Sequence, residues 1–136
     1  MKSFLDTNLI VCANDARDPQ KQARAIEVIT REMRGGTGVI STQVMQEYAV
    51  VAGSKLHQAP DTIVRQLLLL ESLEVVQVTP VLIRRGLELQ FRYQINDWDA
   101  SILAAAEQAQ CGRLLTEDLN PGQLYATVRI ENPLAS

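Results

Sequence analysis

Short apolar segments alternate with longer segments of helical periodicity along almost the whole chain, and this alternation limits the folds open to it. Strand-like stretches occupy residues 2–5, 38–40, 73–78, 113–116 and 127–130. Between them, apolar residues recur every three or four positions, as they do on the buried face of a helix. Short connections between such units favour a mostly parallel sheet covered on both faces. The sequence therefore predicts an α/β fold with three α/β/α layers and a central sheet of four to five strands.

Capping residues, prolines and glycines mark where the helices should begin and end. Asn96 can accept a hydrogen bond from a free backbone N–H at a helix start, and prolines suit the first turn of three other segments. The expected helices cover residues 19–34, 42–52, 60–70, 80–93 and 97–110. Residues 6–8 read as a turn after the first strand. The periodicity of the first helix predicts a buried face of Ala23, Ile26, Ile29 and Met33.

The composition allows one domain with an aliphatic core. The chain has 136 residues, of which 46% are hydrophobic and only 4% aromatic, so we expect a single domain over residues 1–136. The net charge of −3 argues weakly against phosphate binding, although acids that hold cations count in this formal sum. The chain has two cysteines far apart in sequence and a single histidine, so a zinc site of the usual cysteine and histidine type is not expected. Without a signal peptide or a long apolar run, the protein should be cytoplasmic.

Four carboxylates lie near the ends of predicted strands or early in the helices that follow them. Asp6 ends the first strand and Asp118 follows the fourth, whereas Glu47 lies in the helix after the second strand. Asp99 lies in the first turn of the helix that Asn96 caps. Each acid alone has a structural explanation, as a turn residue, a helix-start acid or a solvated side chain. Because ligands bind at the carboxyl ends of parallel strands, we expect all four to converge on one edge of the sheet.

A cluster of four carboxylates restricts the chemistry of the site. Carboxylates packed together repel one another, so either a cation binds or at least one acid holds a proton. Oxygen ligands without histidine or cysteine favour Mg²⁺ or Mn²⁺. Such ions coordinate phosphate oxygens and lower the pKa of a bound water. Since no nucleophile with an adjacent base is evident, these residues favour hydrolysis by metal-activated water.

Four segments, in order along the chain, resemble the motifs of PIN-domain nucleases. They read FLDTN (4–8), STQVMQE (41–47), NDWDASILAAA (96–106) and LLTEDL (114–119), and ENPL (131–134) resembles the usual end of the family. The resemblance covers nearly the whole chain. A compact chain of this length is most similar to the VapC-type toxins of bacterial toxin–antitoxin pairs.

This resemblance implies a PIN-like fold and an Mg²⁺-dependent endoribonuclease that cleaves structured RNA and is silenced by a cognate antitoxin. Its catalytic and metal-binding residues would be Asp6, Glu47, Asp99 and Asp118. Asp6 and Asp99 would bind the metal directly, and Glu47 and Asp118 would bind it through water. The side chains expected to orient these carboxylates are Thr7, Asn8 and Thr116. Asp97 is interpreted as a helix-start acid, with metal ligation as the alternative, and Glu117 is an alternative ligand to its neighbour.

Several side chains outside the motifs are candidates for contacts with RNA or protein partners. Four arginines either grip RNA phosphates or belong to solvated helix faces: Arg17, Arg84, Arg85 and Arg92. Trp98 is interpreted as an anchor of the helix start in the core, with base stacking as the alternative. The stretches 67–70 and 87–93 carry more apolar residues than one buried face needs, which predicts a homodimer or antitoxin interface.

Two other classes of function are compatible with such a sheet. An aspartyl-nucleophile phosphatase or phosphotransfer domain would use the acid after the first strand, but it needs a second acid near Asp6 and a lysine past a late strand. Asn8 occupies the first place, and no lysine follows Lys55. The third class is a non-catalytic PIN-like interaction module, against which the intact acids argue.

Overall fold

Within residues 1–135, which the computed structural model describes, six strands form one sheet in the order β3-β2-β1-β4-β6-β5. The strands are β1 (Ser3–Leu5), β2 (Gly38–Ser41), β3 (Glu74–Val76), β4 (Arg113–Leu115), β5 (Leu124–Tyr125) and β6 (Val128–Glu131). All neighbours pair in parallel except β5, which is antiparallel to β6. The predicted mostly parallel sheet is confirmed, with one more strand than expected because β5 has only two residues.

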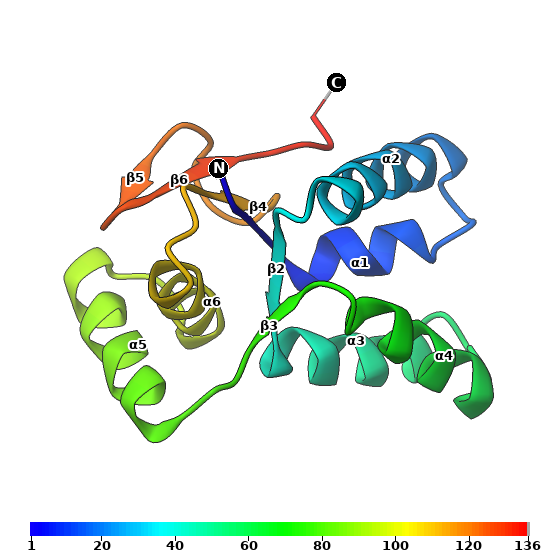
Figure 1. The fold of residues 1–136 in the computed structure, drawn as a ribbon, viewed down its shortest axis with the longest axis horizontal. Coiled ribbons are helices and arrows are strands. Elements are labelled where there is room, and N and C mark those ends of the chain that lie inside the picture. Colours follow the sequence, from blue (N-terminus) through cyan, green and yellow to red (C-terminus); the bar gives the residue numbers. More distant parts are fainter. Residues whose placement is uncertain (136) are drawn as a thin grey trace.

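In the same part of the chain, six helices surround this sheet. They are α1 (Thr7–Ala13), α2 (Pro19–Gly35), α3 (Thr42–Ser54), α4 (Pro60–Leu70), α5 (Pro80–Tyr93) and α6 (Asp97–Gln108). Figure 1 shows α5 and α6 on one side of the strands and the other four helices on the opposite side. The predicted α/β/α layering is therefore confirmed. None of these helices, within the described residues, is both long and apolar enough to cross a bilayer.

The capping residues determine the helix bounds as predicted. Ser41 Oγ accepts a hydrogen bond from the Val44 N–H at 3.2 Å, and Asn96 Oδ1 accepts one from the Asp99 N–H at 2.9 Å. After α2, Gly36 has a φ of 66°, a left-handed conformation that glycine adopts without the cost of a Cβ. These local signals explain why α2, α3, α5 and α6 begin and end within two residues of their predicted bounds.

The segment after the first strand differs from the prediction, because it is a helix rather than a turn. Asp6 is the N-cap of α1, and its Oδ1 accepts a hydrogen bond from the Thr7 N–H at 2.8 Å. Leu9 and Ile10 are buried by this helix. A helix of seven residues shows too little periodicity to be distinguished from a turn by pattern alone.

The buried face of α2 agrees with the prediction only in part. Ile29 and Met33 are partly buried against the core, as predicted. Ala23 is exposed and Ile26 is 46% exposed, whereas Ala25 and Val28 are buried. Glu32 is buried on the same face as Ala25 and Val28. A buried carboxylate must be hydrogen-bonded or paired to be tolerated, so the partners of Glu32 help to determine which face of α2 packs inward.

The core is aliphatic, as the composition predicts. Tyr48 and Phe4 are the largest fully buried side chains, and the others of that set are leucine, isoleucine and valine. The inward face of α6 and its C-cap is small and apolar and joins this core: Ile102, Ala105, Ala106 and Ala109. Small side chains let α6 lie close to the sheet, where it contacts β2, β4 and β6.

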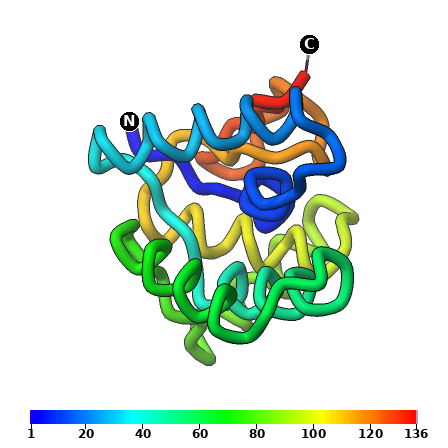
Figure 2. Tube along the Cα trace, turned by 90° about the vertical axis from the view of Figure 1, so that its right-hand side faces the viewer, coloured from blue at the N-terminus to red at the C-terminus, as the bar shows by residue number. Residues whose placement is uncertain are grey.

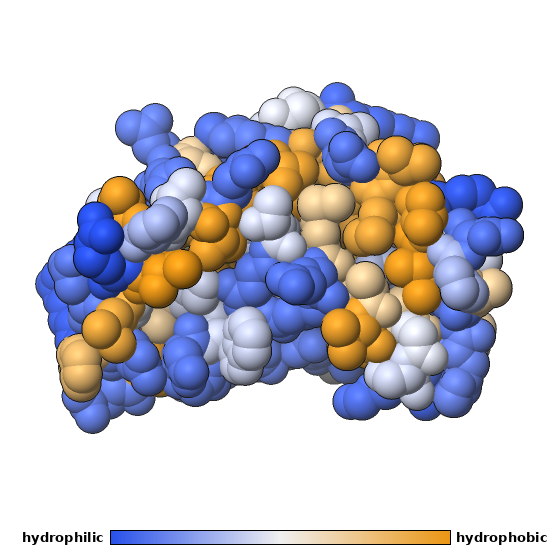
Figure 3. Space-filling view, turned by 90° about the horizontal axis from the view of Figure 1, so that it is seen from below, coloured by the Kyte–Doolittle hydropathy of each residue, from blue (hydrophilic) through white to orange (hydrophobic). Residues whose placement is uncertain are grey.

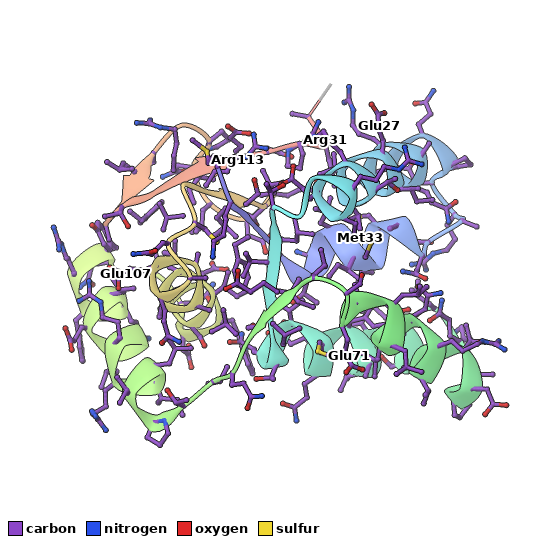
Figure 4. All side chains as sticks on the ribbon, in the orientation of Figure 1. Glu27, Arg31, Met33, Glu71, Glu107 and Arg113 are labelled. Carbon is purple, nitrogen blue, oxygen red and sulfur yellow. The ribbon has the colours of Figure 1, made fainter. Side chains whose placement is uncertain are left out.

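Glu32 is the centre of a polar network at the end of the sheet where β1 and β4 begin. It accepts hydrogen bonds from Thr37 Oγ1 at 2.8 Å and from the Arg113 guanidinium at 3.3 Å. Arg113 also donates to Ser3 Oγ at 2.6 Å, so it links both strands to α2; Figure 4 shows Arg113 and Arg31 at this end. Burial raises the pKa of Glu32, but hydrogen bonds from Thr37 and Ser3 and the positive charge of Arg113 outweigh this effect and leave the pKa below its usual value.

Glu32→Gln should therefore destabilise the fold by about 1–3 kcal/mol at pH 7, because Arg113 loses its buried partner and keeps only the exposed Glu131. The folded-state pKa lies below the ordinary value of 4.5, so this stabilisation is present above about pH 4.5 and is lost as the pH falls through the folded-state pKa. Urea unfolding at several pH values measures the effect. The exposed Glu27→Gln is the matched control on α2. Equal stabilities of wild type and Glu32→Gln at pH 7 would contradict this account.

Candidate active site

The carboxyl ends of β1 and β4 bring distant parts of the chain to one edge of the sheet. Leu5 pairs with Leu115 in the parallel register, so the next residues, Asp6 and Thr116, are neighbours. Figure 2 shows the blue helix α1 below the orange segment that follows β4 and above the yellow helix α6. The motif segments of the sequence therefore meet where parallel sheets usually bind ligands.

Asp6 is held between two hydrogen-bond donors. Its Oδ1 accepts from the Thr7 N–H at 2.8 Å, and its Oδ2 accepts from the Thr116 hydroxyl at 2.7 Å. Thr116 Oγ1 in turn accepts from the Asp118 N–H at 3.0 Å. Asp6 is only 4% exposed, so its carboxylate is fixed in orientation and largely removed from water. Thr116 thereby orients both Asp6 and the loop that carries Asp118.

The four predicted acids act on one another electrostatically. Burial and the charges of Asp118 and Asp99 raise the pKa of Asp6 from 3.8 to about 7, against the hydrogen bonds that Asp6 accepts. Burial also raises the pKa of Asp99, and the charges of Asp118 and Glu47 add to this effect. Carboxylates perturb each other in this way when they are near one another. The four acids therefore lie near the same edge of the sheet, each within range of the charge of at least one other.

Each of the three outer acids accepts a hydrogen bond from a nearby amide side chain. The pairs are Asn8 with Asp118 at 3.0 Å, Gln43 with Glu47 at 2.7 Å and Asn96 with Asp99 at 2.9 Å. A neutral amide orients a carboxylate without cancelling its charge. Sequence reasoning missed the contact between Gln43 and Glu47, although their spacing of four residues on one helix was an available signal.

The other two acids of the motif segments, Asp97 and Glu117, make different contacts. Glu117 Oε2 pairs with Lys21 Nζ at 3.0 Å, which links the loop after β4 to α2 and neutralises this carboxylate. Asp97 is exposed in the first turn of α6 and lines a cavity of about 390 Å³ against α5. Asp97 therefore occupies the helix-start position expected of it, and the partner of Glu117 was not anticipated from the sequence.

Most of the candidate arginines make contacts within the protein. Arg85 forms hydrogen bonds of 2.7 and 2.8 Å with the Glu107 carboxylate, which Figure 4 shows between α5 and α6. Arg17 pairs with Asp15 at 2.9 Å. Arg92 lies 5.2 Å from the centre of the Tyr93 ring, whereas Arg84 lines the cavity that contains Asp97. The Arg85 ion pair therefore joins α5 to α6.

Trp98 does not anchor the start of α6 in the core, so this interpretation was wrong. The side chain is 62% exposed. The start of α6 is instead held by the Asn96 cap, and Ala100 and Ile102 are the buried residues that follow. Trp98 lines the cavity that contains Asp97 and also a second cavity of about 490 Å³ that contains Glu47.

The potential ligand atoms at this edge of the sheet suit a hard divalent cation. They are carboxylates and neutral oxygen-bearing side chains, the ligand types preferred by Mg²⁺ and Mn²⁺. Thr7 Oγ1 lies beside Asp6 and, among the described residues, is the buried side-chain polar atom without a hydrogen-bond partner. No three acidic, histidine or cysteine side chains of residues 1–135 are close enough to form a ready metal cage. The chemical types of these side chains therefore suit a cation. To coordinate one ion together, Glu47, Asp99 and Asp118 must move closer to Asp6.

The comparisons with known proteins agree with this arrangement. The PIN-domain family model matches residues 3–125, and no curated protein matches the sequence. A toxin–antitoxin complex from Klebsiella pneumoniae and VapBC2 from Rickettsia felis, bound to a DNA fragment from its promoter, each have a TM-score of 0.70, 20% identity and coverage of 97% of this chain and 98% of theirs. VapC20 of Mycobacterium tuberculosis, a sarcin–ricin-loop-cleaving toxin, has a TM-score of 0.67, 17% identity and coverage of 86% and 92%.

At these identities the solved structures show a common fold only. The match to the PIN-domain family model is a match of sequence, so it shows membership of the family. This match begins in β1 and ends in β5, so it includes all four acids and the strands that position them. The chain therefore belongs to the PIN-domain family.

Proposed function

We propose that this domain, over residues 1–136, is a divalent-metal-dependent endoribonuclease and the toxin of a toxin–antitoxin pair. The convergence of four acids at one sheet edge, with raised pKa values for Asp6 and Asp99, carries the proposal. PIN-domain nucleases generally depend on a divalent metal ion. We assign Mg²⁺, with Mn²⁺ as a substitute, and we assign Asp6 and Asp99 as direct ligands. Glu47 and Asp118 would bind the ion through water.

The residues at this edge of the sheet would have different roles in hydrolysis. A bound divalent ion would supply Lewis acidity for the attack of water on an RNA phosphodiester. Asp6 offers an oriented carboxylate because Thr7 and Thr116 hold both of its oxygens. Asn96 holds Asp99 in the first turn of α6. These fixed positions lower the cost of arranging the ligands around the reacting phosphate.

The contacts of Asp6 argue against an aspartyl-nucleophile mechanism. Both carboxylate oxygens accept short hydrogen bonds, and the side chain is 4% exposed. A nucleophilic carboxylate needs an oxygen that can reach phosphorus. Asn8 donates its amide to Asp118, so it does not supply the second acid that this class requires. Because position 8 carries an amide and not the second acid of that class, the site favours metal-activated water over covalent catalysis.

The purified protein should cleave RNA in the presence of Mg²⁺, and EDTA should stop the reaction. Asp6→Asn and Asp99→Asn should each lower kcat at least about 100-fold, because each removes a negative ligand of the ion. Asp61→Asn, which changes an exposed acid in the first turn of α4, is the matched control and should retain full activity. Cleavage that continues in EDTA, or in Asp6→Asn, would overturn the metal mechanism.

Asp6→Asn should also stabilise the metal-free protein at high pH. The pKa of Asp6 rises from 3.8 in an unfolded chain to about 7, so the folded state is penalised increasingly as the pH rises through this window. At about 1.4 kcal/mol per pKa unit, we expect Asp6→Asn to gain on the order of 2–4 kcal/mol over wild type at pH 8. Thermal unfolding between pH 5 and pH 8 measures the difference.

Mg²⁺ should reverse this order, because it stabilises only a native state that binds it. Wild type should gain melting temperature on addition of Mg²⁺ or Mn²⁺, whereas Asp6→Asn and Asp99→Asn should lose most of that gain. The Asp61→Asn control should respond as wild type does. A pH-independent difference between wild type and Asp6→Asn, or an equal response to metal, would contradict the assignment.

We further propose that the protein is a homodimer that contacts its partner through α5. Ile83 and Leu87, one helical turn apart on α5, are 62% and 53% exposed. Figure 3 shows apolar side chains gathered over α5 and, separately, over α4, with mainly hydrophilic residues between them. Exposed apolar surface of this kind usually marks a protein contact.

Leu87→Asp should convert the dimer to a monomer, because it places a charge in an apolar contact. Light scattering after size-exclusion chromatography measures the mass, and Glu88→Asp on the same helix is the control. A wild type with the mass of one chain, or an unchanged mass for Leu87→Asp, would contradict the α5 dimer.

We assign the separate apolar patch on α4, formed by Val64, Leu68 and Leu69, to an antitoxin. These side chains are 56–61% exposed, and the structural neighbours from Klebsiella pneumoniae and Rickettsia felis are complexes of toxins with antitoxins. Both cysteines, Cys12 and Cys111, are free, which fits the reducing cytoplasm. We place the activity in that compartment.

A further inference from the structure

We propose that Trp98 is a stacking platform for an unpaired base of the RNA, next to the phosphate that is cleaved. The inference rests on the proposed ribonuclease function and adds a substrate-binding residue to it. Trp98 immediately precedes Asp99, and its 62% exposed indole lines a cavity of about 490 Å³. The opposite wall of that cavity comes from α3: Gln43, Gln46, Glu47, Val50 and Val51.

This cavity adjoins the acid cluster through Glu47, which lines it together with Trp98, the residue before Asp99. Gln43, also in the wall, donates to the Glu47 carboxylate at 2.7 Å. A nucleotide whose phosphate lies at the acids would therefore place its base, or the base of its neighbour, within reach of Trp98.

The chemistry of the cavity suits a base better than a phosphate. Glu47 repels a phosphate, but its carboxylate can accept a hydrogen bond from the amino group on a base edge. Gln46 is exposed and offers both an amide donor and an amide acceptor. The indole and the side chains of Val50 and Val51 supply the apolar surface on which a flat base can stack.

The fold does not need an aromatic side chain at position 98. Asn96 caps α6, and the buried face of the helix begins at Ala100. An exposed indole therefore adds little to the packing of α6, so removing it should leave the protein folded. A large apolar side chain kept in solvent beside a polar cluster is typical of a binding residue.

Trp98 is the single tryptophan of the chain, so its fluorescence reports directly on stacking. Wild-type protein, with Ca²⁺ in place of Mg²⁺ so that an oxygen-ligated cation is present without turnover, should show quenched emission when an eight-nucleotide single-stranded RNA binds. The same RNA with an abasic site at the stacked position should bind more weakly and quench less, whereas abasic sites elsewhere should have little effect. Quenching that does not depend on any base would overturn the proposal.

Kinetics of the active enzyme give the second readout. Trp98→Ala should raise KM at least about fivefold with kcat within about twofold of wild type, whereas Trp98→Phe should retain most of the binding because a ring still stacks. Phe91→Ala removes an aromatic that is 70% exposed on α5 and lines neither cavity, so it should leave KM unchanged. A circular-dichroism melt of each variant confirms that it is folded.

The outcomes separate this inference from the function on which it rests. If wild type cleaves no RNA, the ribonuclease proposal fails. If wild type cleaves RNA and Trp98→Ala has the same KM, only the role of Trp98 fails. If Trp98→Ala instead changes the mass of the protein in solution, and Phe91→Ala shares its kinetic defect, the aromatic surface belongs to a subunit contact and the base-stacking assignment is wrong.

Discussion

The burial of the Asp6 carboxylate between the Thr7 N–H and the Thr116 hydroxyl is the interaction on which the rest of the site depends. It joins the end of β1 to the end of β4, and it removes a negative charge from water beside two other acids. Such an arrangement costs folding free energy when the carboxylate is ionised and no cation is present. The fold therefore keeps a carboxylate whose ionised form is destabilised at one edge of the sheet. Such a perturbed acid is typical of a functional site, here one that binds a positive ion.

The opposite end of the same strand pair is held by a network in which the charges are balanced. Arg113, at the start of β4, contacts Ser3 at the start of β1 and the buried Glu32 on α2. Thr116, just after β4, contacts Asp6 just after β1. The β1–β4 pair is thus held at both ends, by an ion pair that stabilises the fold at one end and by an uncompensated acid at the other. This division lets the acidic edge carry an electrostatic cost without loss of the strand register.

Patterns in the sequence predicted five of the six described strands, five of the six described helices and the position of the four acids near one sheet edge, because these features follow from periodicity, caps and the geometry of parallel strands. They did not predict α1, which is too short to show a period, or the burial of Ala25, Val28 and Glu32 on α2, where Glu32 contacts the distant Arg113. Trp98 was misassigned because a tryptophan beside a helix cap has the same local pattern whether it packs inward or faces solvent. Exposure is a tertiary property, and so is the pairing of Glu117 with Lys21.

The central claim is that one divalent ion site is formed by carboxylates from separate segments of the chain. Crystals soaked in Mn²⁺ test it most directly, because anomalous scattering locates the ion without assumptions about ligands. The account predicts a peak about 2.0–2.3 Å from carboxylate oxygens of both Asp6 and Asp99, and no such peak in Asp6→Asn crystals. A well-occupied Mn²⁺ elsewhere with none at Asp6, or an ion bound equally in the variant, would contradict it.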